Sequence, residues 1–364
     1  MAAPKRSLEV STFRFEKYIL YETSSYFYLV GTSADEKIYR MLKIDRGVER
    51  PNSLAEIITE DESEYTKQEV SDMLEMIDDG NKSSGGLNQV VVACGIFGFI
   101  RFLDCYYITL ITQRKKIGKI GPNFIYSVKA AEVFAIKPKE RSGRNPLLKI
   151  WSKVTKKMNQ TTTDTAESKY MGLYQFLDIT KDFFFSYSYD LTHSLQHNYA
   201  MSNKRCDPPP PSQDIFEWNN YQMEEFKTVI GDQRASRWVL HFIHGSFQQK
   251  MFSIFGNSLY MTLIARRSRH YAGTRYLKRG VNVHGKVAND CEIEEILQYE
   301  DGALAKFSSY IQHRGSIPTY WAQETSVTMP KPPILISRTD PSFKATQEHF
   351  SDLFLRYALV YSFT

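Results

Sequence analysis

The chain has 364 residues, of which 42% are apolar and 14% aromatic, so it is long enough for two domains with packed cores. This composition excludes a wholly disordered chain. A net charge of +5 is too small to imply a nucleic-acid partner, and we expect none.

Charge is distributed unevenly along the chain. Residues 56–79 hold ten acidic residues and one basic residue, whereas residues 137–157 hold eight basic residues and one acidic residue. The first residues, MAAPKRSLEV, lack the apolar core of a secretory signal. The longest apolar run, residues 90–100, is far shorter than the about 20 residues that a membrane helix needs. We therefore expect a protein that is soluble or peripheral to a membrane.

The first half of the chain alternates strand and helix signals. After a polar leader, the segments rich in Tyr, Ile, Phe and Val predict strands over residues 17–30, 39–45, 90–102, 106–112 and 125–136. Thr66 is followed by Glu69 at the capping-box spacing, and apolar residues then recur at helical intervals, which predicts a helix over residues 66–79. The first half is therefore predicted to be a mixed sheet-and-helix module that folds on its own.

Two stretches interrupt this pattern. Residues 137–169 are basic and then rich in threonine, which predicts a loop or insertion with a short helix over residues 147–158. Residues 206–214 contain four consecutive prolines, which favour a polyproline II conformation. That run is either a ligand for an SH3 or WW domain or an insertion loop.

The second half again mixes strands and helices. Residues 183–196 predict a strand followed by the start of a helix. Residues 238–247, 250–256 and 259–268 predict strands separated by glycine-containing turns. The whole chain is therefore predicted to belong to the mixed α/β (α+β) class.

Cysteine and histidine spacing gives no metal signature. The four cysteines lie far apart without a Cys-x-x-Cys pair, which indicates reduced structural thiols. His241 and His244 lack an acidic or cysteine partner at zinc-ligand spacing, so we interpret them as strand histidines and expect no metal site.

The densest cationic cluster lies between residues 264 and 280. Guanidinium groups bind phosphate oxygens in a bidentate manner, so the cluster could bind inositol phosphates or anionic lipid head groups. The alternative is a solvated face that pairs with the acidic residues of segment 290–295. The candidate binding residues are Arg266, Arg267, Arg269, Arg275, Lys278 and Arg279.

The segment IARRSRHYAGTRYLKRG at residues 264–280 resembles a stretch of the Sac-domain phosphoinositide phosphatases. Further blocks agree in the family's order between residues 17 and 334, including KYILYET, YRMLKIDR, GNKSSGGL, FFFSYSYDLTHSLQ, SYIQHRGSIPTYWAQ and MPKPPI. The blocks FSYSYDLTHSLQ and MPKPPI are most similar to the vacuolar and endosomal branch, which acts on phosphatidylinositol 3,5-bisphosphate.

The resemblance implies a hydrolase that removes phosphate from inositol head groups without a cofactor. It implies an N-terminal Sac module over residues 17–178 and the first part of an α/β catalytic domain over residues 179–357, with residues 1–16 as leader and 358–364 as a divergent tail. His313 and Arg314 line the family's substrate cleft or only shape a turn. Family analogy further suggests phosphoinositide lipids, a scaffold protein and a lipid kinase as partners, at the cytoplasmic side of endosomal or vacuolar membranes.

The implied nucleophile is a cysteine thiolate in a Cys-x5-Arg loop. The residues six positions after the four cysteines are Ile100, Ile111, Ser212 and Leu297, so no such loop occurs in the chain. We therefore expect a truncated form of the phosphatase that is inactive alone. The alternative is a non-catalytic module that binds membranes or partner proteins.

Overall fold

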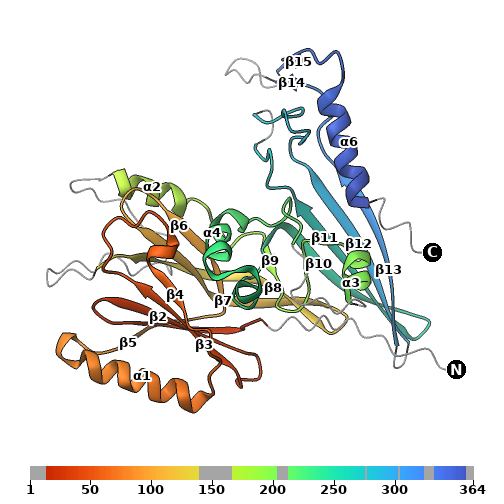
Figure 1. Ribbon diagram of the computed structural model, residues 1–364. Coiled ribbons are helices and arrows are strands. Elements are labelled where there is room, and N and C mark those ends of the chain that lie inside the picture. Colours follow the sequence, from red (N-terminus) through yellow and green to blue (C-terminus); the bar gives the residue numbers. More distant parts are fainter. Residues whose placement is uncertain are drawn as a thin grey trace, which may run out of the picture.

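The computed structural model describes residues 14–138, 166–202, 212–274, 277–301, 304–323 and 332–357. Two antiparallel sheets form its framework (Figure 1). The first sheet has the order β4-β3-β2-β1-β5, and the second has the order β13-β12-β11-β10-β9-β8-β7-β6. The predicted mixed α/β class is confirmed.

The first sheet contains β1 (Lys17–Glu22), β2 (Tyr26–Thr32), β3 (Tyr39–Asp45), β4 (Ile58–Glu60) and β5 (Asn88–Ala93). Helix α1 (Lys67–Asn81) packs against it through Val70 and lies on its outer side (Figure 1). Thr66 caps α1 in the predicted capping box: its hydroxyl accepts from Glu69 N, and the Glu69 carboxylate accepts from Thr66 N at 2.7 Å. The helix predicted over residues 66–79 is therefore confirmed.

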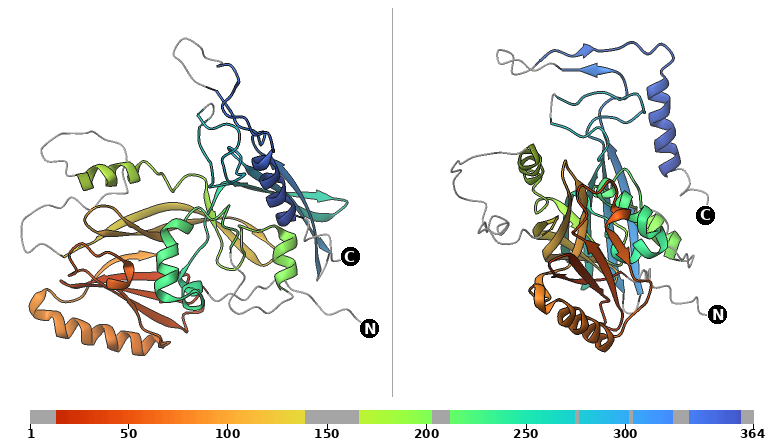
Figure 2. Two further views of the ribbon diagram at one scale, coloured as in Figure 1. Left: turned by 45° about the horizontal axis from the view of Figure 1, so that its top comes forward. Right: turned by 60° about the vertical axis from the view of Figure 1, so that its left-hand side comes forward.

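The second sheet runs from one half of the molecule to the other (Figures 1 and 2). Its strands are β6 (Gly95–Arg101), β7 (Tyr106–Ile120), β8 (Asn123–Ile136), β9 (Phe183–Phe185), β10 (Ile243–Ile254), β11 (Asn257–Arg267), β12 (Cys291–Asp301) and β13 (Leu304–Arg314). Because β8, β9 and β10 pair side by side, one sheet contains strands from both sides of the expected boundary at residue 178. That boundary stays a prediction.

The remaining elements are α2 (Ala166–Gln175), α3 (Leu195–Ser202), α4 (Asn220–Ile230), α5 (Asp232–Trp238), α6 (Lys344–Tyr357), two short 3-10 helices (Leu54–Glu56 and Lys82–Ser84) and the strand pair β14 (Trp321–Ala322) and β15 (Leu335–Ile336). Among the described residues, no helix has both the length and the apolarity needed to cross a bilayer.

Helices α4 and α5 complete the core of the first sheet. Trp238 is fully buried, and its indole Nε1 donates to Glu60 Oε1 at 2.6 Å. Gly31 on β2 makes room for that ring, since a Cβ there would lie 2.9 Å from Trp238 Cζ3. Phe226 on α4 stacks on Phe99 in the same core. Segment 17–177 therefore shares its core with α4 and α5, which argues against the expectation that it folds alone.

Four predicted elements need correction. The strand predicted over residues 90–102 is two strands in different sheets, because the chain changes sheet at Cys94. The next residue, Gly95, packs closely against Leu240: a Cβ on Gly95 would lie 2.6 Å from Leu240 Cδ1. The strands predicted over residues 238–247 and 250–256 form one strand, β10, which pairs with β11 without a break. The loop predicted over 137–169 ends earlier, since α2 begins at Ala166. The helix predicted over 147–158 lies outside the described residues.

Candidate functional site

Strands β11, β12 and β13 bring the predicted cationic cluster into register. Residues directly opposite each other on neighbouring antiparallel strands have side chains on the same face of the sheet. Arg266 pairs with Glu292, which pairs with His313, and Arg267 pairs with Cys291, which pairs with Arg314. The sheet therefore divides the cluster: Arg266, Glu292 and His313 lie on one face, which we call the buried face, and Arg267, Cys291 and Arg314 lie on the other, the open face.

Arg266 is fully buried and is held by the fold itself. Its Nη1 donates to Glu292 Oε1 at 2.8 Å, and its Nη2 donates to Glu294 Oε2 at 2.5 Å. Its Nε donates to the Leu191 carbonyl at 2.5 Å and its Nη2 to the His193 carbonyl at 2.9 Å. Burial alone would lower the pKa of Arg266, but Glu294 and Glu292 raise it above its ordinary value. With its donors engaged and no exposed surface, Arg266 has a structural role and is not available to a phosphate group.

His313 belongs to the same buried polar network. Its Nε2 lies against Asp290 Oδ1, and the Arg356 guanidinium lies 3.6 Å from Asp290 Oδ2. Tyr357 donates its hydroxyl to Glu292 Oε2, so the end of α6 closes over this face. The expectation that His313 lines a substrate cleft stays a prediction.

The loop after β11 is fixed by pairing with Asp214. Arg269 Nε donates to the Asp214 carbonyl at 2.9 Å and its Nη2 pairs with the carboxylate, while His270 Nε2 lies 2.8 Å from Asp214 Oδ2. Burial alone would raise the pKa of Asp214, but Arg269 and His270 lower it. The charge of Arg269 is therefore matched by a carboxylate that lies more than fifty residues away in the sequence.

The open face carries the exposed cations. The Arg314 side chain is exposed, and its guanidinium makes no ion pair or hydrogen bond within the described part of the chain. Arg267 is partly exposed, with Nη2 donating to Asn289 Oδ1 at 2.7 Å and to the Gly273 carbonyl at 3.0 Å. Arg267 and Arg314 are two strands apart, or about 10 Å between backbones, a span that two long side chains can close around one phosphate.

Lys278 and Arg279 follow in the loop between β11 and β12, which passes the end of β13. Gly280 N donates to Ser316 Oγ at 2.9 Å, which ties this loop beside the residues after Arg314. Gly280 has φ +68, and a Cβ there would lie 2.5 Å from the Thr319 carbonyl, so glycine permits the close approach. Lys278 is exposed, with Nζ 4.9 Å from the Tyr271 ring centroid.

We call Arg267, Lys278, Arg279 and Arg314 the cationic rim. Arg279 is partly exposed, and its Nε donates to Gln323 Oε1 at 2.9 Å. Arg275, the remaining candidate, lies outside the described residues.

The described cysteines are poor nucleophiles. Burial raises the pKa of Cys94 to about 11, although Arg114 lies nearby and acts in the opposite direction. Burial and then Asp290 raise the pKa of Cys291, and this outweighs the lowering by Arg314 and Arg267. A thiolate nucleophile needs a lowered pKa. The third described thiol, Cys105, is buried with a raised pKa as well, and Cys206 lies outside the described residues.

The two histidines considered for zinc have other contacts. His241 Nδ1 lies 2.9 Å from Glu217 Oε1, and His244 packs against the rings of Phe183 and Trp218. Within the ranges that the structure describes, no group of three His, Cys, Asp or Glu side chains could hold a metal ion.

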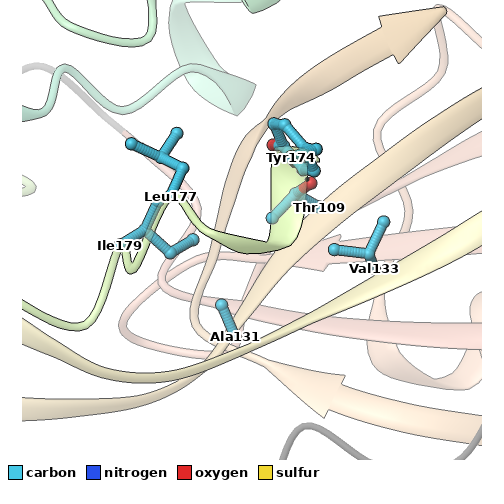
Figure 3. A pocket seen from close by; sticks show the side chains of 6 residues that line it. All are labelled: Thr109, Ala131, Val133, Tyr174, Leu177 and Ile179. Carbon is cyan, nitrogen blue, oxygen red and sulfur yellow. Dashed lines mark hydrogen bonds between the residues drawn. The ribbon is translucent and has the colours of Figure 1, made fainter. Parts of the chain in front are cut away.

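Two hollows within the described residues are poor sites for a head group. A cavity of about 10 Å³ under α2 is lined mainly by apolar side chains, with the Thr109 and Tyr174 hydroxyls 3.0 Å apart at one side (Figure 3). It has room for at most one water molecule. An open groove of about 540 Å³ beside α6 contains Lys286, which pairs with Asp352 at 3.1 Å, so its charges largely cancel. The cationic rim therefore remains the best candidate for binding anions.

Comparison with known proteins shows the family of the chain. A family model described as the SacI homology domain matches residues 94–363. The chain belongs to the SacI homology domain family.

Relatives of this SacI-domain chain are named phosphoinositide phosphatases. It is 40% identical over 364 residues to "Phosphoinositide phosphatase SAC2" of Arabidopsis thaliana, across 98% of this chain and 42% of the relative. It is 40% identical over 348 residues to "Phosphatidylinositol-3-phosphatase SAC1" of the same plant, across 95% of this chain and 35% of the relative. It is 33% identical over 357 residues to the "Polyphosphoinositide phosphatase" of Schizosaccharomyces pombe, across 94% of this chain and 39% of the relative. The chain spans about two-fifths of the length of the curated relatives it matches.

The open face of this SacI-domain chain is also exposed beyond the rim. Leu263, which pairs with Glu295, is 38% exposed, and Tyr310, which pairs with Glu295 from the other side, is 63% exposed. On the opposite face the residues between them, such as Ile264 and Ile296, are buried. One side of this part of the sheet is therefore packed and the other is uncovered by the described residues.

Sequence reasoning missed Asp214 and Asn289, which hold the cationic loop in place. It also missed the division of Arg266 from Arg267. The alternation of side chains along a strand was available as a signal for that division, but which face is buried depends on the pairing with β12.

Proposed function

We propose that this SacI-domain chain binds the phosphorylated inositol head group of membrane phosphoinositides through the cationic rim. The exposed Arg314 guanidinium, without an acidic partner among the described residues, carries this proposal. Arginine can bind a phosphate oxygen pair in a bidentate manner, and lysine adds a point charge. Arg267 is already oriented by Asn289 at 2.7 Å, so part of the ordering cost of binding is met before the ligand arrives.

The proposed lipid is phosphatidylinositol 3,5-bisphosphate on endosomal or vacuolar membranes. The blocks FSYSYDLTHSLQ and MPKPPI support this choice, because they are most similar to that branch of the family. A scaffold protein and a lipid kinase are proposed as partners on the same family analogy.

We further propose that hydrolysis requires a Cys-x5-Arg loop and that this chain alone releases no phosphate. In that reaction the thiolate attacks phosphorus, the bond to the inositol oxygen breaks, and the cysteinyl-phosphate formed is then hydrolysed by water. The 364 residues contain no such loop. The raised pKa values of Cys94 and Cys291 support the same conclusion, since these thiols stay protonated near neutral pH.

The alternative function is a non-catalytic module that binds partner proteins. The uncovered apolar residues of the open face, including Leu263 and Tyr310, favour it. Binding of a partner protein in a pull-down that is lost in Tyr310→Ser but kept in Arg314→Ala would support this alternative over head-group binding.

Vesicle sedimentation tests the head-group proposal. Phosphatidylcholine vesicles with and without phosphatidylinositol 3,5-bisphosphate are compared for the unaltered chain and for Lys278→Ala with Arg314→Ala. Two lost charge-assisted hydrogen bonds should weaken lipid-dependent binding by about tenfold or more. The matched control is Arg50→Ala with Lys82→Ala, which removes the same charge at exposed positions near the first sheet. Sedimentation that is equal with and without the lipid, or equal loss in both double variants, would count against the proposal.

A further inference from the structure

The turn between β10 and β11 forms an exposed apolar projection. Phe255 is 100% exposed, Met251 is 61%, Ile254 is 50% and Phe252 is 42%. Phe255 and Gly256 adopt positive φ of +49 and +79, which closes the hairpin with the phenyl ring at its apex. The tip, residues 250–257, extends beyond the neighbouring part of the sheet (Figures 1 and 2).

Lysines lie on one side of the base of this tip. Segment 115–127, which forms the β7–β8 turn, contains three lysines and no acidic residue, and segment 245–263 contains Lys250 and no acidic residue. The turn is bound to β10, because Lys119 N donates to Gln249 Oε1 at 3.0 Å and Gln249 Nε2 donates to the Lys119 carbonyl at 2.6 Å. On the other side of the hairpin, β12 ends with the acidic residues Glu300 and Asp301, so the base of the tip is cationic on its β7 side only.

The lysines and aromatic rings of this region lie together. Lys116 Nζ lies over the Phe124 ring, and Lys119 Nζ lies 5.0 Å from the Tyr260 ring centroid. Phe124 is 39% exposed, so the lysines of this turn have an exposed aromatic ring beside them. An apolar apex with a cationic base is complementary to a bilayer that contains anionic phospholipid, because the acyl boundary receives the apolar groups while the charged head groups meet the lysines.

We propose that the β10–β11 tip inserts into the surface of an anionic phospholipid bilayer and that Lys115, Lys116 and Lys250 bind its head groups. The lipid recognised is bulk anionic phospholipid and not a phosphoinositide. The tip and Arg267 lie at opposite ends of β11, about 30 Å apart by strand rise, so this contact is independent of the cationic rim.

Vesicle flotation with the full chain tests the proposal on phosphatidylcholine alone and on phosphatidylcholine with phosphatidylserine, both without phosphoinositide. The chain should bind only the second, and more weakly as salt is raised. Removing two apolar side chains with Ile254→Ser and Phe255→Ser should reduce binding by at least about tenfold. Phe176→Ser is the matched control, since Phe176 is 86% exposed at the end of α2 and should have no effect. The charge contribution is tested by Lys115→Glu with Lys116→Glu, which should abolish the preference for phosphatidylserine.

A second measurement places the tip in the bilayer. In Phe255→Trp the added fluorescence should shift to the blue with phosphatidylserine vesicles and be quenched by brominated acyl chains, whereas in Phe176→Trp it should not. The proposal is overturned by equal binding to both vesicles, by no binding at low salt, or by unchanged binding in the Ile254→Ser and Phe255→Ser double variant. It is also overturned if this double variant abolishes self-association in sedimentation velocity, since the tip would then be an interface between copies. The vesicles in these experiments contain no phosphoinositide, so the expected results stay the same even if the variants of the cationic rim lose phosphoinositide binding.

Discussion

Replacing Arg266 with methionine should destabilise the protein strongly. Methionine has a similar length but no charge, so Glu292 and Glu294 would remain buried, with exposed side-chain fractions of 2% and 0%, and without their cation. Leaving one partner of a buried ion pair uncompensated costs about 3–5 kcal/mol. The measurement is urea unfolding at pH 7 followed by tryptophan fluorescence, compared with Arg314→Met, which should change stability by no more than about 0.5 kcal/mol because Arg314 is exposed.

A triple variant separates charge from packing in this prediction. Arg266→Met with Glu292→Gln and Glu294→Gln removes all three charges and should recover most of the lost stability, since neutral replacement of a buried ionic triad is often tolerated. If Arg266→Met unfolds at the same urea concentration as the unaltered chain, Arg266 is not structural. If the triple variant is as unstable as the single one, the loss comes from packing and not from unpaired charge.

Three further predictions address the rest of the fold. Burial and then His193 lower the pKa of His197 to about 4 in the folded chain, whereas its pKa in the unfolded chain is about 6.5. As the pH falls, the unfolded state therefore binds the proton first, so this contribution to stability is complete above pH 6.5 and is lost toward pH 4. The loss should be about 1–2 kcal/mol for this partly solvated ring. In His197→Asn, the free energy of unfolding in urea should differ less between pH 7 and pH 5 than in the unaltered chain. Trp238→Ala should lower the free energy of unfolding by about 3–5 kcal/mol. A fragment of residues 14–177 should lack a cooperative thermal unfolding transition. If a fragment of residues 14–242, which includes α4 and α5, lacks this transition as well, the shared core is refuted. Iodoacetamide at pH 7.5 should alkylate Cys94 and Cys291 at least about tenfold more slowly in the folded chain than in urea, because their pKa values are raised; fast alkylation of either would contradict this.

Local features of the fold could be predicted from the sequence, and non-local ones could not. The start of α1 was predictable, because its capping box involves only Thr66 and Glu69. Strand β3 was likewise predicted with its observed bounds, Tyr39–Asp45. Helix α4 was missed although Met223, Phe226 and Ile230 recur at helical intervals and are buried, so this signal was present and unused.

The change of sheet at Cys94 had no such signal. The sequence there is apolar on both sides, and the residue that packs against Gly95, Leu240, lies nearly 150 residues later. The candidate site shows the same limit. Arg266 and Arg267 are neighbours in the sequence, yet one is sealed by two glutamates of β12 and the other faces outward. Only strand pairing distinguishes them, and that pairing is a property of the folded sheet.

Phosphate release most directly tests the central claim that this SacI-domain chain binds the head group but does not cleave it. The purified chain is incubated with short-chain phosphatidylinositol 3,5-bisphosphate, and inorganic phosphate is measured with malachite green against a boiled control. The account predicts release no greater than the control, together with vesicle binding that depends on Lys278 and Arg314. Release well above the control that is lost on substituting any of the four cysteines with serine would contradict it.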